Sequence, residues 1–229
     1  MDIRIATCVF GRPEITRAFL HHLNYLREES GLKLPVSIAY STQEDLAVLR
    51  EFCTKDDHLI RIDNKPIGRK WNELFKAIIR DTKQTHILGV GSDDFLNVDY
   101  LKYLSENECH HCGVNRFLIY SPMHKRLVEH EFKSPVFKLT GGGRLLSYEA
   151  VRKVFERCNL YATDLNAGLD NNSEMALRNV GFAPTVIDFD GYAFVDVKSM
   201  DNIHKFEEFA NNSDVDFEVL EQIMPNVSF

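Results

Sequence analysis

The 229-residue sequence is poor in the features that mark several classes of protein. Five cysteines, an odd number spread thinly, make a disulfide framework unexpected and favour a reducing, cytoplasmic compartment. The glycines and prolines form no repeat or low-complexity tract, which excludes a collagen-like rod. No apolar run approaches the roughly 20 residues that cross a bilayer. A secretory signal is not expected either, because Asp2 stands where a basic segment would begin.

Positive charge is also in short supply. The 27 Lys and Arg residues are outnumbered by 34 Asp and Glu, which gives a formal net charge of −7. Proteins that coat nucleic acid need clustered Lys and Arg, so this balance argues against that class. Hydrophobic residues at 44% and charged residues at 27% are ordinary for a globular domain and exclude a disordered tail or a long coiled coil.

Two common nucleotide-binding motifs are missing. The sequence contains no G-x-x-x-x-G-K-[ST] segment, which excludes a P-loop. Gly89 and Gly91 stand at the end of an apolar run, but no third glycine follows, so the dinucleotide fingerprint fails. A nicotinamide-dependent dehydrogenase is therefore disfavoured.

The first hundred residues alternate between short β-rich runs and helical patterns. Strands are predicted at 3–10, 35–40, 58–62 and 86–90. Apolar residues at helical spacing separate these runs, and the clearest stripe is Ile67, Trp71, Leu74, Phe75 and Ile78. This order predicts an α/β fold, with a parallel sheet covered by helices on both faces. Ligands of such sheets bind beyond the carboxyl ends of the strands, here segments 10–13, 41–44, 63–66 and 91–94.

The pattern loosens after residue 100. Strands are predicted at 117–121, 136–140 and 185–189, a helix behind the capping residue Ser147, and another helix over about 173–180. Apolar spacing in the tail predicts two short helices packed on the body. We expect one domain over 1–200 and a helical tail, 201–229, packed on the same domain.

Asp93 and Asp94 directly follow the fourth predicted strand. Two adjacent carboxylates repel each other unless a cation offsets their charge. Hard divalent ions bind carboxylate and diphosphate oxygens together. The pair therefore suggests a metal ion that holds a nucleoside diphosphate. The alternative is a cap for a short helix around 98–104.

Three segments in this half carry a family resemblance: Phe10-Gly11-Arg12-Pro13, then Asn64 to Asn72 (NKPIGRKWN), then Ser92-Asp93-Asp94. In order and spacing they resemble the nucleotide-binding half of GT-A glycosyltransferases of the large family-2-like group. A weaker likeness continues through 141–147. The resemblance implies a three-layer α/β/α GT-A fold with a mostly parallel central sheet, in which 1–100 is the nucleotide-binding half and 101–200 the acceptor half.

The resemblance also implies an activity: metal-dependent, inverting transfer of a hexosyl or pentosyl group from a nucleoside diphosphate sugar to a hydroxyl acceptor. The acceptor could be a glycan, a protein, a small molecule or a modified nucleobase. The donor would contact Val9, Phe10, Gly11, Arg12, Lys65, Arg69, Asn72 and Asp93. Asp94 and His204 would hold Mn²⁺ or Mg²⁺. Asp170 would be the general base, with Asp164 and Glu174 in reserve.

Two other functions remain open at this point. A nucleotidyltransferase shares a parallel sheet and metal carboxylates, but it should carry a longer glycine-rich loop than Gly11-Arg12-Pro13. A non-catalytic zinc-stabilised binding module over 109–130 would use Cys109, Cys112, His124 and His130, which approach zinc-finger spacing. The remaining cysteines, Cys8, Cys53 and Cys158, are predicted to be buried thiols.

Overall fold

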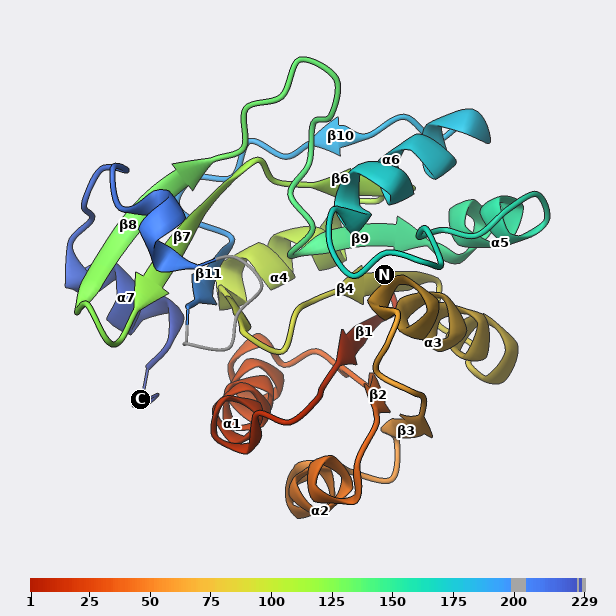
Figure 1. Ribbon diagram of the computed structural model, residues 1–229, viewed down its shortest axis with the longest axis horizontal. Helices are drawn as coiled ribbons and strands as arrows, with labels where there is room; N and C mark the ends of the chain where they lie inside the picture. Colours follow the sequence, from red (N-terminus) through yellow and green to blue (C-terminus); the bar gives the residue numbers. More distant parts are fainter. Residues whose placement is uncertain (199–204, 226, 228–229) are drawn as a thin grey trace.

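Two β-sheets organise the computed structural model of the protein, which describes residues 1–198, 205–225 and 227 (Figure 1). The larger sheet has seven strands, in the spatial order β10 (Thr185–Val186), β6 (His111–Gly113), β9 (Arg144–Ser147), β4 (His86–Gly89), β1 (Ile3–Cys8), β2 (Val36–Tyr40) and β3 (His58–Arg61). The smaller has four, in the order β5 (Asp94–Leu96), β11 (Phe194–Val197), β7 (Arg116–Ser121) and β8 (Arg126–Glu131). The helices are α1 (Pro13–Ser30), α2 (Gln43–Phe52), α3 (Ile67–Asp81), α4 (Val98–Glu106), α5 (Tyr148–Phe155), α6 (Leu169–Asn179) and α7 (Phe217–Ile223), with one 3₁₀ turn, η1 (Phe206–Phe209).

Helices cover both faces of the larger sheet, as predicted. Adjacent residues of β1 point to opposite faces, so Ile5 and Ala6 belong to two different apolar clusters. The cluster around Ile5 includes residues of α1, α2 and α4, and the cluster around Ala6 includes residues of α3, α5 and α6. Figure 1 shows these two sets of helices on opposite sides of the strands. The predicted α/β/α layering is confirmed.

The first half follows the sequence prediction closely. β1 pairs in parallel with β2 and β4, and β2 pairs in parallel with β3. Thr42 caps the start of α2. The Thr42 hydroxyl accepts a hydrogen bond from the backbone N–H of Asp45, and the Asp45 carboxylate accepts one from the N–H of Thr42.

The second half departs from the prediction in several places, and strands β6, β8 and β11 lie outside the predicted strands. Segment 136–140 is not a strand, because the backbone N–H groups of Lys138 and Leu139 donate to the buried carboxylate of Glu174. Helix α6 begins at Leu169, four residues earlier than predicted. The predicted strand 185–189 shortens to Thr185–Val186. Strand β9 is antiparallel to both neighbours, β4 and β6.

The described part of the tail packs on the body. Phe206 of η1, Ile223 of α7 and Met224 are buried in the same cluster as Ile5. The division at residue 200 stays a prediction. Among the described residues, no helix combines the length and apolar character needed to span a membrane.

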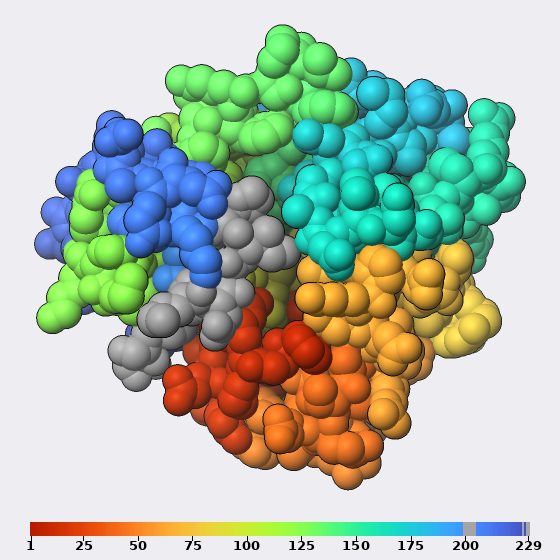
Figure 2. All heavy atoms as spheres, in the orientation of Figure 1, coloured from red at the N-terminus to blue at the C-terminus, as the bar shows by residue number. Residues whose placement is uncertain are grey.

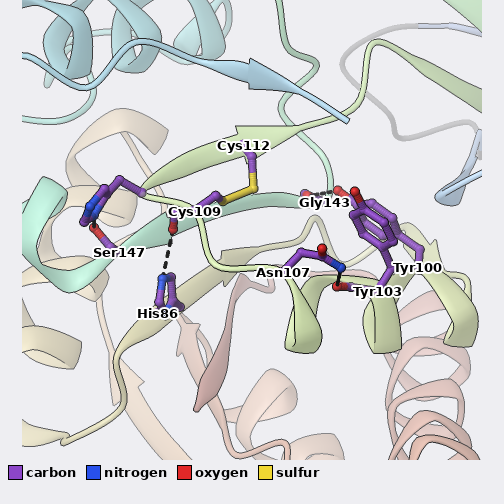
Figure 3. The surroundings of a disulfide bond; sticks show 9 residues. His86, Tyr100, Tyr103, Asn107, Cys109, Cys112, Gly143 and Ser147 are labelled. Atoms are coloured by element: carbon purple, nitrogen blue, oxygen red, sulfur yellow. Dashed lines mark hydrogen bonds between the residues drawn. A yellow bond between two sulfur atoms is a disulfide. The ribbon is translucent and has the colours of Figure 1, made fainter. Parts of the chain in front are cut away.

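The cysteines correct two expectations. Cys109, which precedes β6, forms a disulfide with Cys112 within β6 (Figure 3), so their sulfurs offer no thiolates to zinc. His124 lies beside Glu207, and His130 contacts Asn212. Because the paired sulfurs cannot act as ligands, the zinc-stabilised module is contradicted.

The free thiols also differ from expectation. Cys158 is exposed, because it follows the end of α5, whereas Cys8 and Cys53 are half-buried.

A buried histidine joins α1 to the strand that begins with Asp94. The His22 Nε2 lies 2.8 Å from the carbonyl oxygen of Leu96, and the ring packs against Phe95. Its Nδ1 is buried and has no hydrogen-bond partner among the described residues. Burial lowers the pKa of His22 to about 4, because a second N–H would have no acceptor. The imidazole is therefore neutral and donates through Nε2.

We predict that His22 makes the protein acid-sensitive. Its folded pKa lies below the unfolded value of about 6.5, so the unfolded state binds the extra proton and stability falls as the pH drops from about 6.5 towards 4. Between pH 7 and 4.5 this histidine should cost about 2 to 3 kcal/mol of unfolding free energy. His22→Gln retains an N–H donor without titrating, so urea unfolding should show a smaller acid loss. The control is His21→Gln on the exposed side of α1. An unchanged acid loss in His22→Gln would contradict this assignment.

Candidate functional site

The loops after β1 and β4 meet at the carboxyl edge of the larger sheet. Arg12 Nη1 lies 2.9 Å from the Asp93 carboxylate, and Arg12 Nη2 donates to the hydroxyl of Ser92 at 3.0 Å. Arg12 and Asp93 are both partly exposed. The strand-end segments that the sequence singles out are thus joined by an ion pair.

A buried carboxylate fixes the loop after β1 to the loop after β2. Asp45 accepts hydrogen bonds from the backbone N–H groups of Gly11 (2.8 Å), Thr42 (3.0 Å) and Ser41 (3.3 Å). Burial acts to raise the pKa of Asp45, but these amide donors outweigh it, so the pKa is lowered. Asp45 stays ionised and holds both loops in place.

Lys70 fixes the same edge from the side of α3. Its buried ammonium donates to the carbonyl of Val9 (2.7 Å), the hydroxyl of Ser41 (2.8 Å) and the side-chain carbonyl of Asn64 (3.2 Å). Burial lowers its pKa. Three strand-end loops, those after β1, β2 and β3, therefore converge on one side chain.

Helix α3 also holds the segment before α6. The buried amide of Asn72 donates to the carbonyl of Tyr161 (2.8 Å) and accepts from its N–H (3.0 Å). The backbone of Ala162 lies so close to Gly68 that a Cβ at position 68 would overlap its carbonyl oxygen. These contacts bring the two halves of the chain together across α3.

Asp94 begins β5 and lies in a crowd of charges. It is directly opposite Asp196 of β11, and its Oδ2 accepts from the N–H of Gly91 at 2.8 Å. Lys198 Nζ donates to Asp196 Oδ2 at 2.5 Å. Burial, followed by the charges of Asp196 and Asp93, raises the pKa of Asp94 well above its usual range. Burial also raises the pKa of Asp196, to about 6, against the opposing effect of Lys198.

The turn before β9 brings Asp94 and Asp170 to neighbouring residues. A Cβ on Gly141 would overlap the Asp170 carboxylate, and a Cβ on Gly142 would lie 2.8 Å from Asp94 Oδ2. Gly141 and Gly142 are consecutive, and consecutive Cα atoms are about 3.8 Å apart. The two carboxylates therefore flank one short piece of glycine backbone that larger residues would block.

Two buried charges fix the start of α6, where Asp170 lies. Arg144 of β9 donates to the carbonyl of Asp170 (3.2 Å) and to the hydroxyl of Ser173 (2.6 Å). Glu174 pairs with Arg178 at 2.6 Å and accepts from the loop that precedes Gly141. The Asp170 side chain itself is exposed. Buried side chains thus fix the backbone of Asp170, while its carboxylate stays accessible to solvent.

Several solved structures with a similar fold are glycosyltransferases, and a 4-diphosphocytidyl-2C-methyl-D-erythritol synthase also matches, with a TM-score of 0.51 at 13% identity over 83% of this chain and 90% of that one. S. aureus TarS in complex with UDP-GlcNAc matches with a TM-score of 0.59 at 13% identity, over 97% of this chain and 65% of that one. A Drosophila galactosyltransferase 7 variant with manganese, UDP-Gal and xylobiose matches at 0.56 and 14%, over 97% and 79%. The Pyrobaculum calidifontis mannosyltransferase PcManGT with GDP-Man and Mn²⁺ matches at 0.56 and 11%, over 90% and 59%.

This chain has the GT-A glycosyltransferase fold. It spans less than two thirds of the length of the TarS structure. No family model matches the sequence, and no curated protein does.

Of the predicted residues, Arg12, Asp93, Asp94 and Asp170 come together around the loops after β1 and β4 and the turn before β9. Figure 2 shows a hollow at the centre of the drawn face, with the red N-terminal segment, the gold start of α3 and the teal segment before α6 on its border. Phe10 is exposed, and so are Lys65 and Arg69 at the start of α3. The side chains of Val9 and Asn72 are buried against other parts of the protein, so they are not accessible to a ligand. His204 lies outside the described residues.

The carboxylates of this GT-A site fit part of the shell of a divalent cation. Asp196 Oδ1 is buried and has no hydrogen-bond partner within the described residues. Asp94 is crowded by like charge, which a cation would relieve. No three His, Cys, Asp or Glu side chains in the described part of the chain form a group that could hold a metal alone. Mg²⁺-type sites commonly use one or two carboxylates and complete the shell with substrate phosphates.

The sequence assigned no role to Asp45, Asp196 or Lys198. Asp196 and Lys198 alternate with the buried residues Val195 and Val197, which is the period of a half-buried strand. That alternation could have located β11. Its pairing with β5 could not be foreseen, because it joins residues about a hundred positions apart.

We predict that Glu174 is structural and not a reserve base. Its side chain is fully buried and accepts from Lys138, Leu139 and Arg178. Glu174→Gln should lower the unfolding free energy by about 1 to 3 kcal/mol, because an amide replaces an ionised acceptor of several donors. Urea unfolding is the measurement. Glu149→Gln, which removes an exposed ion-pair partner of Lys153, should leave the unfolding free energy close to that of the wild type. Equal effects of the two substitutions would contradict this role.

Proposed function

We propose that the protein transfers a sugar from a nucleoside diphosphate sugar to a hydroxyl acceptor, with a divalent metal ion at Asp94. The observation that carries this proposal is the position of Asp94. It lies at the carboxyl edge of a GT-A sheet, opposite Asp196, with the exposed Asp170 beside the next glycine of the same turn. Neighbours of the same fold bind UDP-sugars or GDP-Man, and two of them were solved with Mn²⁺.

The donor would lie across the loops after β1 and β4. Phe10, 45% exposed, offers an aromatic face to the nucleoside next to the backbone of Gly11. Arg12 and Asp93 border the same edge, and the exposed Lys65 and Arg69 supply positive charge for the phosphates. When bound, Mn²⁺ or Mg²⁺ would neutralise charge on the departing diphosphate.

Asp170 is the proposed general base. The acceptor oxygen forms a bond to the anomeric carbon while the bond from that carbon to the phosphate oxygen breaks. The bonding electrons leave with the diphosphate, and Asp170 takes the proton of the acceptor hydroxyl. Asp170 approaches the Gly141–Gly142 backbone beside Asp94, so it can serve an acceptor next to the donor. Attack opposite the leaving group would invert the anomeric centre.

We expect donor binding to depend on both the metal and Asp94. A thermal-shift screen of UDP-, GDP-, CMP- and TDP-sugars, with and without Mn²⁺, should give a metal-dependent rise in Tm with at least one donor. Asp94→Asn should abolish that rise, because the cation loses its carboxylate. Asp99→Asn, on the exposed first turn of α4, is the matched control and should retain it. The absence of any shift in the wild-type protein would contradict the proposed function.

Asp170→Asn should separate binding from chemistry. We expect the metal-dependent Tm shift to persist, whereas release of nucleoside diphosphate from the same donor should fall about 100-fold or more, because the base is lost. The substitution removes the charge and keeps the shape. Asp99→Asn, on the exposed first turn of α4, should leave the rate near that of the wild type. A rate unaffected by Asp170→Asn would remove Asp170 from the mechanism.

A further inference from the structure

Lys198 is a buried cation among the carboxylates of the candidate site. Its side chain is 8% exposed, and its ammonium bonds Asp196, which is the cross-strand partner of Asp94. Burial alone would lower the pKa of Lys198, but the neighbouring carboxylates, led by Asp196, raise it. Lys198 therefore carries a full positive charge at the floor of the site.

The ion pair between Lys198 and Asp196 uses only some of the hydrogen-bonding atoms of the two side chains. Lys198 holds Oδ2 of Asp196, while Oδ1 has no partner among the described residues. An ammonium has three N–H donors, and the structure gives one side-chain acceptor, Asp196, to that of Lys198 within the same residues. Asp196 Oδ1 can thus bond a further group, and the Lys198 ammonium, which also lies 5.5 Å from the centre of the Phe209 ring, keeps N–H donors for one.

The charges of the cluster suggest which group this is. Among the described residues, and with a bound metal ion keeping the carboxylates ionised, Asp93, Asp94 and Asp196 contribute three negative charges, and Arg12 and Lys198 contribute two positive ones. A divalent cation would reverse the remaining charge from −1 to +1. A diphosphate would then meet attraction and not repulsion. Without Lys198, the same cation would leave the site neutral.

We infer that Lys198 binds the diphosphate of the donor directly, as a second cation beside the metal, and that Asp196 positions it. The inference rests on the proposed function and adds a binding residue to the same site. In this arrangement the metal and Lys198 share the charge that develops on the leaving diphosphate. Lys198 carries the same charge as Lys65 and Arg69, but it is buried, whereas those two residues are exposed near the start of α3.

The test compares the binding of a diphosphate with the binding of Mn²⁺ alone, since substitution of Lys198 should weaken the first and not the second. Inorganic pyrophosphate and UDP, each with Mn²⁺, are titrated by calorimetry, and Mn²⁺ alone is titrated by electron paramagnetic resonance. Lys198→Met should weaken diphosphate binding about 10- to 100-fold, because a charge-assisted hydrogen bond is lost. It should bind Mn²⁺ alone at least as tightly as the wild type, since a repelling charge is gone.

Three further variants serve as controls for the loss of charge, for folding and for the removal of an exposed lysine. Lys198→Arg retains the charge and should restore most of the diphosphate affinity. The double variant Asp196→Asn/Lys198→Gln leaves no unpaired buried charge, so it should fold and still bind diphosphate weakly. Lys133→Met, which removes an exposed lysine in the loop after β8, is the control and should bind like the wild type.

The inference is overturned if Lys198→Met binds diphosphate as tightly as Lys133→Met does. It is also overturned if Lys198→Met loses Mn²⁺ binding in parallel, because Lys198 would then only hold the carboxylates in place. Both results leave the proposed function standing. If wild-type protein with Mn²⁺ binds neither pyrophosphate nor a nucleotide of the donor screen, the proposed function fails and this inference fails with it.

Discussion

Repulsion between carboxylates is the constraint on which the site depends. Asp93 follows a strand of the larger sheet, whereas Asp94 and Asp196 lie on paired strands of the smaller one. Burial, followed by the charges of Asp196 and Asp93, raises the pKa of Asp94, and the fold offsets the charge with Arg12 and Lys198. Such an arrangement is costly unless a ligand uses it, so strained electrostatics of this kind point to a binding site.

The supporting contacts explain how the site is kept open. Asp45 bonds backbone N–H groups of the strand-end loops, and Lys70 bonds one backbone carbonyl and two side chains there. Glu174 and Arg144 fix the base of α6. These buried charges hold loops that carry few apolar residues of their own. The surface above them is left to exposed groups such as Phe10 and Asp170. Rigid support beneath an accessible rim is what precise positioning of a reacting group requires.

The nucleotide-binding half could be predicted because its signals are local. Alternating strands and helices with apolar periodicity define 3–89 almost to the residue, and Asp93 and Asp94 stand where a parallel sheet exposes its ligands. The second half depends on pairings between distant segments, such as β5 with β11, which no local pattern encodes. Segment 136–140 has the composition of a strand, yet its amides bond Glu174 instead. Asp196 and Lys198 were missed for the same reason, since their importance comes from the strand they pair with.

The account stands on a cation at Asp94 that also binds the donor diphosphate. The most direct measurement is anomalous diffraction at the manganese edge from crystals soaked with Mn²⁺ and UDP or GDP. The account predicts one strong peak in contact with the Asp94 carboxylate and with the oxygens of the bound diphosphate. A nucleotide bound at this edge without a peak, or a manganese peak away from Asp94, would contradict it.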